Sequence, residues 1–585
     1  MDLSRLDPLI QAKIHTWLGS AFDSLTHKNI EDLLKTHPEE LIDAFYTDLS
    51  FGTGGVRALM GVGTNRLNIY TIRLITQALA SYLMRLNMVS PLVVIGYDSR
   101  HHSLEFAEET AKVLAGNNIE VRLFPDIRPT PYTSFACRYL KASAAVMITA
   151  SHNPKEYNVY KVYWSDGAQV VPPHDVGILE ESHKNHSLST VRLAPLSSSL
   201  IRKTDPSLDT AYLKAIEPLQ LQKKDNREKG HLLKVIYTSL HGTGITMVPK
   251  ALSSWGFTNI AYVEQQIIPD GNFPTVKFPN PEYPETLQLG TALLLAKEGD
   301  LLLASDPDAD RLGVVCLHQK KGVILTGNEI ASICTYYLCS TLKTQGTLTP
   351  KTTFISTIVS TRLIEAIATS FGAHYCDVLT GFKYIGEKIH QWESEASEYQ
   401  FLFGAEESYG YLLGSVARDK DAIIASCLLS EIALHLKLQG KTLIDALHTI
   451  YKHYGVYREG QVSLSFASGK EGSEKIEALM HSLREKPLSE LCGKKVLRRF
   501  DYLQKKEVDI AKNTVRPLTL PLSDVLIFTL EGGGRLIIRP SGTEPKIKIY
   551  ASLFRKVEPD AVEQGLLLGD KELEQLLSSA KKELS

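Results

Sequence analysis

Residues 144–154 read AAVMITASHNP, in which a short apolar run leads directly into a loop of small and polar residues. Residues 301–311 read LLLASDPDADR and repeat this order, with three aspartates at alternate positions after the apolar run. Such short apolar runs bounded by turn residues are typical of buried strands. In parallel α/β sheets, ligand-binding residues gather in the loops at the carboxyl ends of the strands. The two segments therefore predict an α/β fold whose chemistry lies in these loops.

The rest of the chain continues the alternation of short apolar runs with amphipathic stretches. Further strands are expected at residues 92–96, 233–238, 401–403 and 535–538, and helices at 69–86, 104–115, 328–342 and 422–438. No short repeat period is visible, which excludes a solenoid or a propeller. We expect three successive α/β domains and a C-terminal α+β domain, with boundaries at 1–205, 206–325, 326–455 and 456–585.

The composition is that of a globular protein, with 43% hydrophobic and 22% charged residues among 585. Lys and Arg number 64 against 66 Asp and Glu, a balance that argues against nucleic-acid binding by bulk positive charge. Seven cysteines without a CxxC pair suggest reduced thiols rather than disulfides or a zinc site. The charged N-terminus and the absence of long apolar runs argue against a signal peptide and a membrane span. We expect a cytoplasmic protein.

The loop after residues 144–148 displays Ser151 at a strand end, although the same residues also suit an ordinary turn. A hydrolase pair of Ser151 with His152 is disfavoured, because neighbouring side chains of an extended segment point to opposite sides. The surroundings also lack the G-x-S-x-G pattern. We expect His152 to be a local structural partner of the serine loop.

The aspartates of the second loop, Asp306, Asp308 and Asp310, can converge on one divalent cation, and their oxygen atoms favour Mg²⁺. An EF-hand is excluded, because Arg311 and Leu317 occupy the places of its glycine and glutamate. The alternative is an acidic surface turn. Three crowded carboxylates repel one another unless a positive charge lies between them, so the metal interpretation is preferred.

Three more segments carry polar chemistry. Residues 539–546, RPSGTEPK, lie between two apolar runs and offer donors to a phosphate, or else form a hairpin turn. Residues 404–410, GAEESYG, place carboxylates beside a hydroxyl, which suits sugar hydroxyls or a capped helix start. Residues 51–57, FGTGGVR, follow no clear strand and are not a dinucleotide-binding loop.

Taken together and in this order, these five segments resemble the α-D-phosphohexomutase family, over roughly residues 50 to 555. Four stretches are most similar to its longer phosphoglucomutase/phosphomannomutase branch, which includes phosphopentomutases and glucose-1,6-bisphosphate synthases: ITASHNPKEYNVYKVYW, PDGNFPTVKFPNPE, LTGFKYIG and GAEESYGYL. The resemblance implies a four-domain enzyme with one loop from each domain at a central cleft. It also implies sugar phosphates as substrates.

The resemblance further implies a role for each matching residue. Ser151 would carry the phosphoryl group and, with Asp306, Asp308 and Asp310, hold one Mg²⁺ per subunit. Lys161, a candidate general base, and Arg57 would act beside the transferring group, and Arg311 would support the metal loop or the substrate. Sugar and phosphate contacts would come from Thr380, Gly381, Lys383, Glu406, Ser408, Arg539, Ser541, Gly542, Thr543 and Lys546.

The expected reaction interconverts glucose 1-phosphate and glucose 6-phosphate through glucose 1,6-bisphosphate. Mannose and pentose phosphates are alternative substrates, and a glucose-1,6-bisphosphate synthase, a sugar-phosphate sensor or a phosphatase are alternative functions. The chain departs from several bacterial relatives, which carry a histidine in the sugar loop where this one reads EESYG. Residues 223–231, KKDNREKGH, are expected to form a solvated insertion. Neither the oligomeric state nor a role for the first 50 residues is predicted.

Overall fold

The computed structural model describes residues 6–52, 54–184, 187–466, 470–541 and 546–584. The chain divides into two compact units. The first comprises Met1–Leu325, Ile385–Glu398 and Ser408–His435, and the second comprises Thr326–Tyr384, Tyr399–Glu407 and Leu436–Ser585. Among the described residues, every helix is too short or too polar to cross a lipid bilayer.

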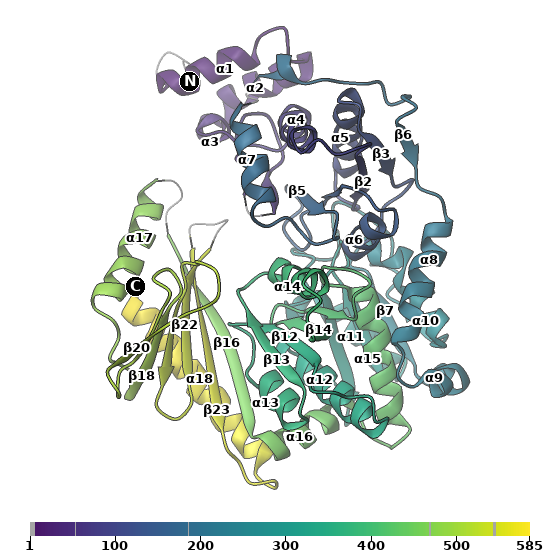
Figure 1. Ribbon diagram of the computed structural model, residues 1–585, viewed down its shortest axis with the longest axis vertical. Coiled ribbons are helices and arrows are strands. Elements are labelled where there is room, and N and C mark those ends of the chain that lie inside the picture. Colours follow the sequence, from purple (N-terminus) through teal and green to yellow (C-terminus); the bar gives the residue numbers. More distant parts are fainter. Residues whose placement is uncertain (1–5, 53, 185–186, 467–469, 542–545, 585) are drawn as a thin grey trace. The chain divides into compact units, whose positions relative to one another are not determined.

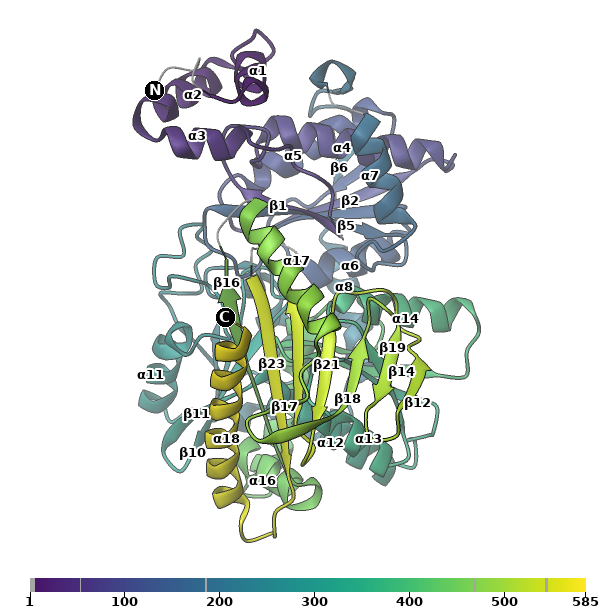
Figure 2. The ribbon, with the colours of Figure 1, turned by 90° about the vertical axis from the view of Figure 1, so that its left-hand side faces the viewer.

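The first unit begins with a six-stranded sheet of order β1-β5-β4-β2-β3-β6. Its strands are β1 (Gly55–Leu59), β2 (Leu92–Tyr97), β3 (Glu120–Leu123), β4 (Ala144–Ile148), β5 (Tyr157–Trp164) and β6 (Ile201–Lys203). The neighbours among β2, β3, β4 and β6 run parallel, whereas β5 is antiparallel to β4 and β1. Helices α4 (Ile69–Arg85) and α5 (Ser103–Gly116) cover one face and α6 (Thr130–Tyr139) the other (Figure 1 and Figure 2). All five residues of β4 are buried, as expected for a strand covered on both faces.

A second sheet, of order β11-β10-β9-β7-β8, completes the strands of this half of the chain. Its strands are β7 (Val235–Thr238), β8 (Ile260–Tyr262), β9 (Leu301–Ser305), β10 (Leu312–His318) and β11 (Lys321–Leu325), and its helices are α8 (Ser207–Ile216), α9 (Lys223–Lys229), α10 (Val248–Trp255) and α11 (Gln288–Ala296). β7 and β9 are parallel neighbours, and β9 and β10 are antiparallel with Ser305 opposite Leu312. The three predicted metal ligands therefore lie in the turn between β9 and β10.

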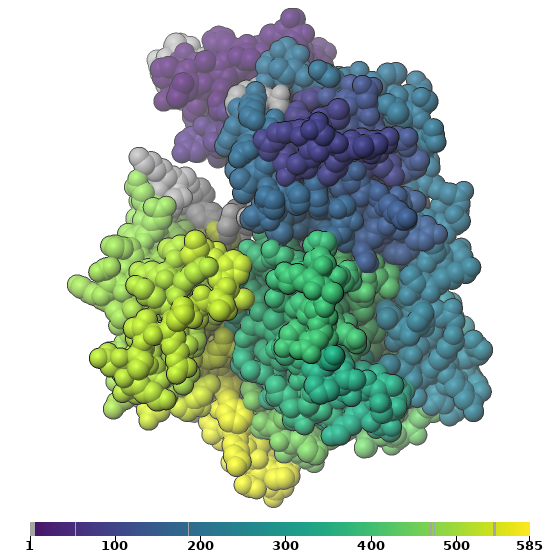
Figure 3. Space-filling view, in the orientation of Figure 1, coloured from purple at the N-terminus to yellow at the C-terminus, as the bar shows by residue number. Residues whose placement is uncertain are grey.

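Residues 6–50 contain three helices, α1 (Pro8–Trp17), α2 (Ser24–Thr36) and α3 (Pro38–Phe45). Their core contains Trp17, Phe22 and Phe45, which pack with Tyr70 from the start of α4. The Tyr70 hydroxyl also donates a 2.6 Å hydrogen bond to Asp23. Figure 3 shows this segment in purple as a lobe at the surface of the first unit. The lobe is thus folded and packs against the start of α4.

The prediction that residues 223–231 are solvated is wrong for one side chain, that of Asn226. The segment contains α9, and the Asn226 side chain is fully buried, donating a 2.6 Å hydrogen bond to the buried carboxylate of Glu431. Glu431 also accepts hydrogen bonds from the backbone of Leu221 and Gln222. Glu431 lies on α15 (Ala422–Lys437), which follows strand β15 (Gly410–Leu413). A distant carboxylate therefore anchors a segment whose composition alone reads as solvated.

The second unit contains parallel strands in the order β13-β12-β14, followed by an antiparallel sheet. The first group is β12 (Thr352–Thr357), β13 (His374–Val378) and β14 (Gln400–Glu406), with α12 (Gly327–Thr344), α13 (Leu363–Ser370) and α16 (Leu443–Tyr454). Helix α14 (Phe382–Ser394) begins after β13. The antiparallel sheet has the order β16-β23-β22-β21-β18-β19-β20, with β17 paired to β18.

The antiparallel sheet contains β16 (Val456–Ser465), β17 (Glu490–Leu491), β18 (Lys494–Asp501), β19 (Lys506–Asp509), β20 (Thr514–Pro517), β21 (Leu526–Leu530), β22 (Arg535–Pro540) and β23 (Lys546–Arg555). Helices α17 (Lys470–Glu485) and α18 (Val562–Leu584) share a hydrophobic core with one face of this sheet (Figure 2). Three α/β sheets followed by an α+β C-terminal region confirm the predicted fold class. The exact boundaries at 205, 325 and 455 stay predictions.

Strand β16 carries Glu459, whose Oε1 is buried and makes no hydrogen bond to any described residue. Burial raises the pKa of Glu459 to about 7, against the pull of Thr361 and Arg458. The folded protein thus holds this proton more tightly than the unfolded chain, where glutamate titrates near ~4.3. The protonated Glu459 therefore makes its full contribution to the free energy of unfolding below about pH 4, and this contribution is lost as the pH rises through 7.

We therefore expect Glu459→Gln to gain free energy of unfolding relative to the wild type as the pH is raised. Between about pH 5.5 and 8.5 the gain should be roughly 2 kcal/mol, measured by denaturant unfolding. The exposed Glu490→Gln is the matched control. Identical pH slopes for Glu459→Gln and the wild type would contradict the prediction.

Candidate active site

Ser151 follows β4 in a turn, with a left-handed backbone (φ 52°) that presents its side chain toward Asp306. Its hydroxyl donates a 2.5 Å hydrogen bond to Asp306 Oδ2 and lies 3.0 Å from His152 Nδ1. The expectation that Ser151 and His152 point to opposite sides is wrong, because the turn replaces the extended backbone on which it rested. Burial lowers the pKa of His152 well below its ordinary value, and Arg311 and Arg57 add to this. The ring is thus a neutral partner of the serine.

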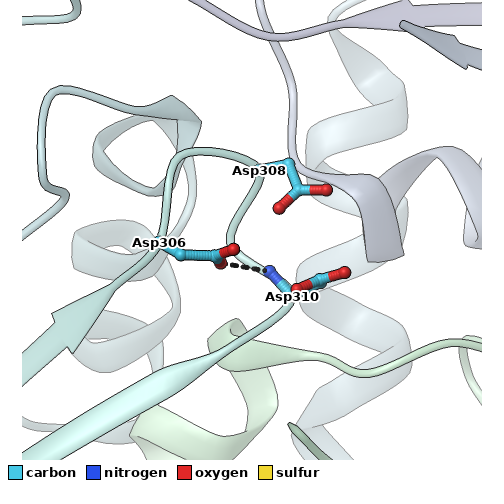
Figure 4. Close-up of side chains that lie close together, drawn as sticks. All are labelled: Asp306, Asp308 and Asp310. Carbon is cyan, nitrogen blue, oxygen red and sulfur yellow. Dashed lines mark hydrogen bonds between the residues drawn. The ribbon is translucent and has the colours of Figure 1, made fainter. Parts of the chain in front are cut away.

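The three aspartates of the turn between β9 and β10 gather at one point. Their nearest carboxylate oxygens lie within 4.8 Å of one another, and all three residues are buried. Asp306 Oδ1 accepts the backbone N–H of Asp310 at 3.0 Å, drawn in Figure 4, and that of Arg311 at 2.9 Å. Oδ1 of Asp308 and Oδ1 of Asp310 make no hydrogen bond to any described residue. Two buried carboxylate oxygens are thus left for a further ligand.

The carboxylates differ in their electrostatics. Burial raises the pKa of Asp306 well above its ordinary value, and the charges of Asp308 and Asp310 add to the shift. Burial acts in the same direction on Asp308, but the Lys161 ammonium outweighs it and holds the pKa of Asp308 below its ordinary value. Asp308 Oδ2 accepts hydrogen bonds from Lys161 Nζ at 2.8 Å and from Thr130 Oγ1 at 2.7 Å. Three buried carboxylates that converge at one point suit a hard divalent cation.

Three basic residues, Lys161, Lys420 and Arg311, lie beside the cluster. Lys161, on β5, also lies 3.6 Å from Asp310, and Lys420 Nζ lies 3.3 Å from the same carboxylate. Burial acts to lower the pKa of Lys161, but Asp308 and Asp310 raise it above its ordinary value. Arg311 pairs with Glu282, and the exposed Arg57 lies on β1. Sequence reasoning missed Lys420. Its signal was the charged run RDKD directly before an apolar helix, where charge has to be paired to be buried.

Arg100 is a second residue that sequence reasoning missed. Its guanidinium is fully buried and donates to the carbonyls of Ser151 at 2.6 Å, Asn153 at 2.5 Å and Pro154 at 2.7 Å. Its Nε lies 3.3 Å from Asp98. The signal was present in the sequence: YDSR follows β2, and β2 is the parallel neighbour of β4. Arg100 fixes the backbone of the serine loop.

We expect Arg100→Lys to lower kcat by about 10- to 100-fold, because one ammonium cannot replace the planar fork that holds three carbonyls. Steady-state kinetics of the expected sugar-phosphate reaction measure this, with a melting curve to show that the variant folds. Arg73→Lys is the control, since the half-buried Arg73 on α4 pairs with a single carboxylate, that of Glu109 on α5. A folded Arg100→Lys variant with the wild-type kcat would contradict the prediction.

The second unit holds the predicted sugar loop. Gly381, with φ 120°, donates its N–H to Glu406 Oε1 at 2.9 Å, so the ends of β13 and β14 are linked. Thr380 Oγ1 is buried and makes no hydrogen bond to any described residue. Lys383 Nζ lies 4.8 Å from the centre of the Tyr384 ring. Ser408 is half-buried and belongs to the first unit.

The predicted phosphate loop lies in the hairpin between β22 and β23 of the second unit. The Ser541 N–H donates to the Lys546 carbonyl at 2.8 Å and closes the base of the loop. Arg539 lies opposite Lys548 on these strands, and the buried Tyr550 of β23 packs in one hydrophobic cluster with Leu379 before the sugar loop. Gly542 and Thr543 lie outside the described residues. Each unit thus gathers its own share of the predicted residues, and their roles remain predictions.

Comparison with known protein families gives four consecutive matches. All are phosphoglucomutase/phosphomannomutase models: alpha/beta/alpha domain I at residues 48–189, domain II at 210–319, domain III at 326–454 and the C-terminal domain at 499–553. Two solved structures share the fold, a phosphoglucomutase/phosphomannomutase family protein from Burkholderia thailandensis and parafusin, a phosphoglucomutase from Paramecium. Each has a TM-score of 0.62, with 18% and 16% identity, and each comparison covers 90% of this chain and 97% or 96% of the other.

Curated relatives are more similar in sequence. A phosphoglucomutase from Staphylococcus epidermidis is 38% identical over 522 residues, which cover 88% of this chain and 92% of the relative. A phosphoglucomutase from Staphylococcus aureus is also 38% identical, over 92% of this chain and 95% of the relative. The agreement extends along nearly the whole length of both proteins. The chain therefore belongs to the phosphoglucomutase/phosphomannomutase family.

Proposed function

We propose that the protein is a phosphoglucomutase, which interconverts glucose 1-phosphate and glucose 6-phosphate through a phosphoserine at Ser151 and a glucose 1,6-bisphosphate intermediate. The observation that carries the proposal is the 2.5 Å hydrogen bond between the Ser151 hydroxyl and Asp306, inside a buried cluster of three aspartates. The relatives named phosphoglucomutase support the choice of glucose.

In the proposed forward step, the 6-hydroxyl of glucose 1-phosphate attacks phosphoserine 151. A bond forms between phosphorus and the sugar oxygen, the bond between phosphorus and Ser151 Oγ breaks, and Lys161 takes the hydroxyl proton. The bisphosphate then returns its 1-phosphate to Ser151 by the reverse chemistry. Arg57 helps to neutralise the equatorial oxygens. Arg311, paired with Glu282, supports the aspartate turn.

Asp306, Asp308 and Asp310 would hold Mg²⁺ together with the phosphoserine, and the ion would supply positive charge to the transferring group. The buried Oδ1 atoms of Asp308 and Asp310, which make no hydrogen bond to described residues, fit this role. The same aspartates raise the pKa of Lys161, which opposes its use as a base. Neutralising them would remove that effect, so the proposed base depends on a filled aspartate cluster.

The other phosphate of the sugar must stay bound during each half-reaction. We assign this task to Arg539, Ser541, Gly542, Thr543 and Lys546, and sugar-hydroxyl contacts to Glu406 and Ser408, oriented by Thr380, Gly381 and Lys383. Arg539 and the closed base of the hairpin at Ser541 and Lys546 support the first assignment. The hydrogen bond from Gly381 to Glu406 supports the second.

A parallel assay tests the proposal. Purified protein with Mg²⁺ and a trace of the matching bisphosphate is given glucose 1-phosphate, mannose 1-phosphate or ribose 1-phosphate. We expect the fastest isomerisation with glucose 1-phosphate and no release of inorganic phosphate. Faster turnover of another sugar would make the protein a phosphomannomutase or phosphopentomutase. Bisphosphate formation only with 1,3-bisphosphoglycerate would identify a synthase, and phosphate release a phosphatase.

A further inference from the structure

The loop that follows β7 lies against the aspartate turn. β7 and β9 are parallel neighbours, with Thr238 paired to Ala304, so the loops at their ends leave the same edge of the sheet. We call Ser239–Thr243 the support loop. Thr243 donates two hydrogen bonds to the Pro307 carbonyl, from its backbone N–H at 2.7 Å and from Oγ1 at 2.9 Å. Pro307 separates Asp306 from Asp308.

Gly242 lies in closer contact still. A Cβ atom added there would lie 2.2 Å from Pro307 Cα and 2.4 Å from the Pro307 oxygen, far inside van der Waals contact. Its backbone has φ −107° and ψ −165°, a conformation open to any residue. The glycine is therefore required by the approach of Pro307 and not by its dihedral angles.

The support loop is itself held rigidly. Leu240 and His241 both adopt the left-handed region, with φ 45° and 63°, which is costly for residues with a Cβ and persists only where contacts enforce it. The buried His241 ring lies 3.1 Å from the Ile268 carbonyl and 2.9 Å from Thr275 Oγ1. The backbone N–H of His241 donates a 2.7 Å hydrogen bond to the Gln266 carbonyl.

The same region also contacts the arginine that holds the serine loop. Ser99 Oγ donates to the His241 carbonyl at 2.8 Å, and the Arg100 guanidinium lies 4.9 Å from the centre of the Phe273 ring. Gly271 packs so closely on the backbone of His101 that a Cβ would lie 2.7 Å from its nitrogen. One connected set of contacts therefore joins the serine loop to the aspartate turn, in addition to the direct bond from Ser151 to Asp306.

We infer that Gly242 and Thr243 are positioning residues for the aspartate centre: by fixing Pro307 they set the spacing of Asp306 and Asp308, and with it the affinity for a divalent cation. The inference rests on the metal site of the proposed function. Three buried carboxylates repel one another, so before a cation enters, a backbone restraint adds to the pairing with Lys161 and Lys420 in keeping them close. Two hydrogen bonds and one backbone contact on Pro307 supply that restraint.

Direct binding of Mn²⁺ to the dephosphorylated full-length protein, followed by electron paramagnetic resonance of the free ion, tests the inference without any sugar phosphate. We expect Gly242→Ala to raise the Kd for Mn²⁺ by about 10- to 100-fold, as loss of supporting contacts does at other metal sites. Thr243→Val, which loses one neutral hydrogen bond, should raise it about 5-fold, and Thr243→Ser should restore it. At saturating metal, kcat should recover while KM for the sugar phosphate stays unchanged.

Thr335→Val is the matched control, because Thr335 is also fully buried and its hydroxyl bonds the Ala331 carbonyl in α12 of the second unit. Its Kd should equal that of the wild type. A folded Gly242→Ala variant with a Kd within about twofold of the wild type would overturn the inference. If Gly242→Ala fails to fold, the Thr243 pair decides: equal Kd values for Val, Ser and wild type overturn it. Because the Mn²⁺ titration contains no sugar phosphate, failure of the mutase assay leaves the Kd values intact.

Discussion

Ser151→Ala is expected to lower kcat by about 10⁴-fold or more while the protein stays folded, because the variant has no oxygen to carry the phosphoryl group. Among the described residues, the lost hydroxyl is within hydrogen-bonding distance of Asp306 and the neutral His152 alone. The hydroxyl is uncharged, so its removal leaves the charge of the aspartate cluster the same. The stability of the fold should therefore change little. Steady-state rates with glucose 1-phosphate and melting curves measure the two properties separately.

A second measurement makes the result specific. After incubation with glucose 1,6-bisphosphate, mass spectrometry should find phosphoserine in the peptide with Ser151 of the wild type, and none in the variant. Ser426→Ala is the control, since Ser426 is also buried and its hydroxyl donates to the Ala422 carbonyl of its own helix. It should retain the wild-type rate. Near-normal turnover by Ser151→Ala would remove the central claim of the proposal.

The elements around the site were predictable because their signals are local. The apolar runs at 144–148 and 301–304 are strands β4 and β9, and the helices expected at 69–86 and 422–438 end within one residue of α4 and α15. A strand buried on both faces needs a continuous apolar run, which is visible in any sequence. The loops after such strands could therefore be examined for chemistry directly.

The contacts that complete the site were not predictable in this way. Arg100 holds the serine loop from about fifty positions away, and Lys420 reaches Asp310 from the segment just before α15. Polar residues in a loop give no sign of their partners until the sheet order is known. A turn at Ser151 was one of the two interpretations left open, but its left-handed backbone was not foreseen, and the side chain of His152 was expected on the wrong side.

The aspartate cluster offers the second large effect. Asp308→Asn is expected to raise the Kd for Mn²⁺ by about 100-fold and to lower kcat by about 10²- to 10³-fold. Asparagine keeps the volume of the side chain and an acceptor for Thr130, but it removes the charge that pairs with Lys161. The buried ammonium then keeps only the longer contact with Asp310, so a cation at the cluster meets more repulsion and less attraction.

The control for this variant lies at the other end of the same strand. Asp300 precedes β9 and accepts the backbone N–H of Lys234 at 2.7 Å, a bond that asparagine can also accept. Asp300→Asn should change Kd and kcat by less than about threefold. Since both substitutions remove one carboxylate charge from the β9 region, a general loss of charge would affect them alike. Only a direct role of Asp308 in cation binding separates them, and equal Kd values for the two variants would refute that role.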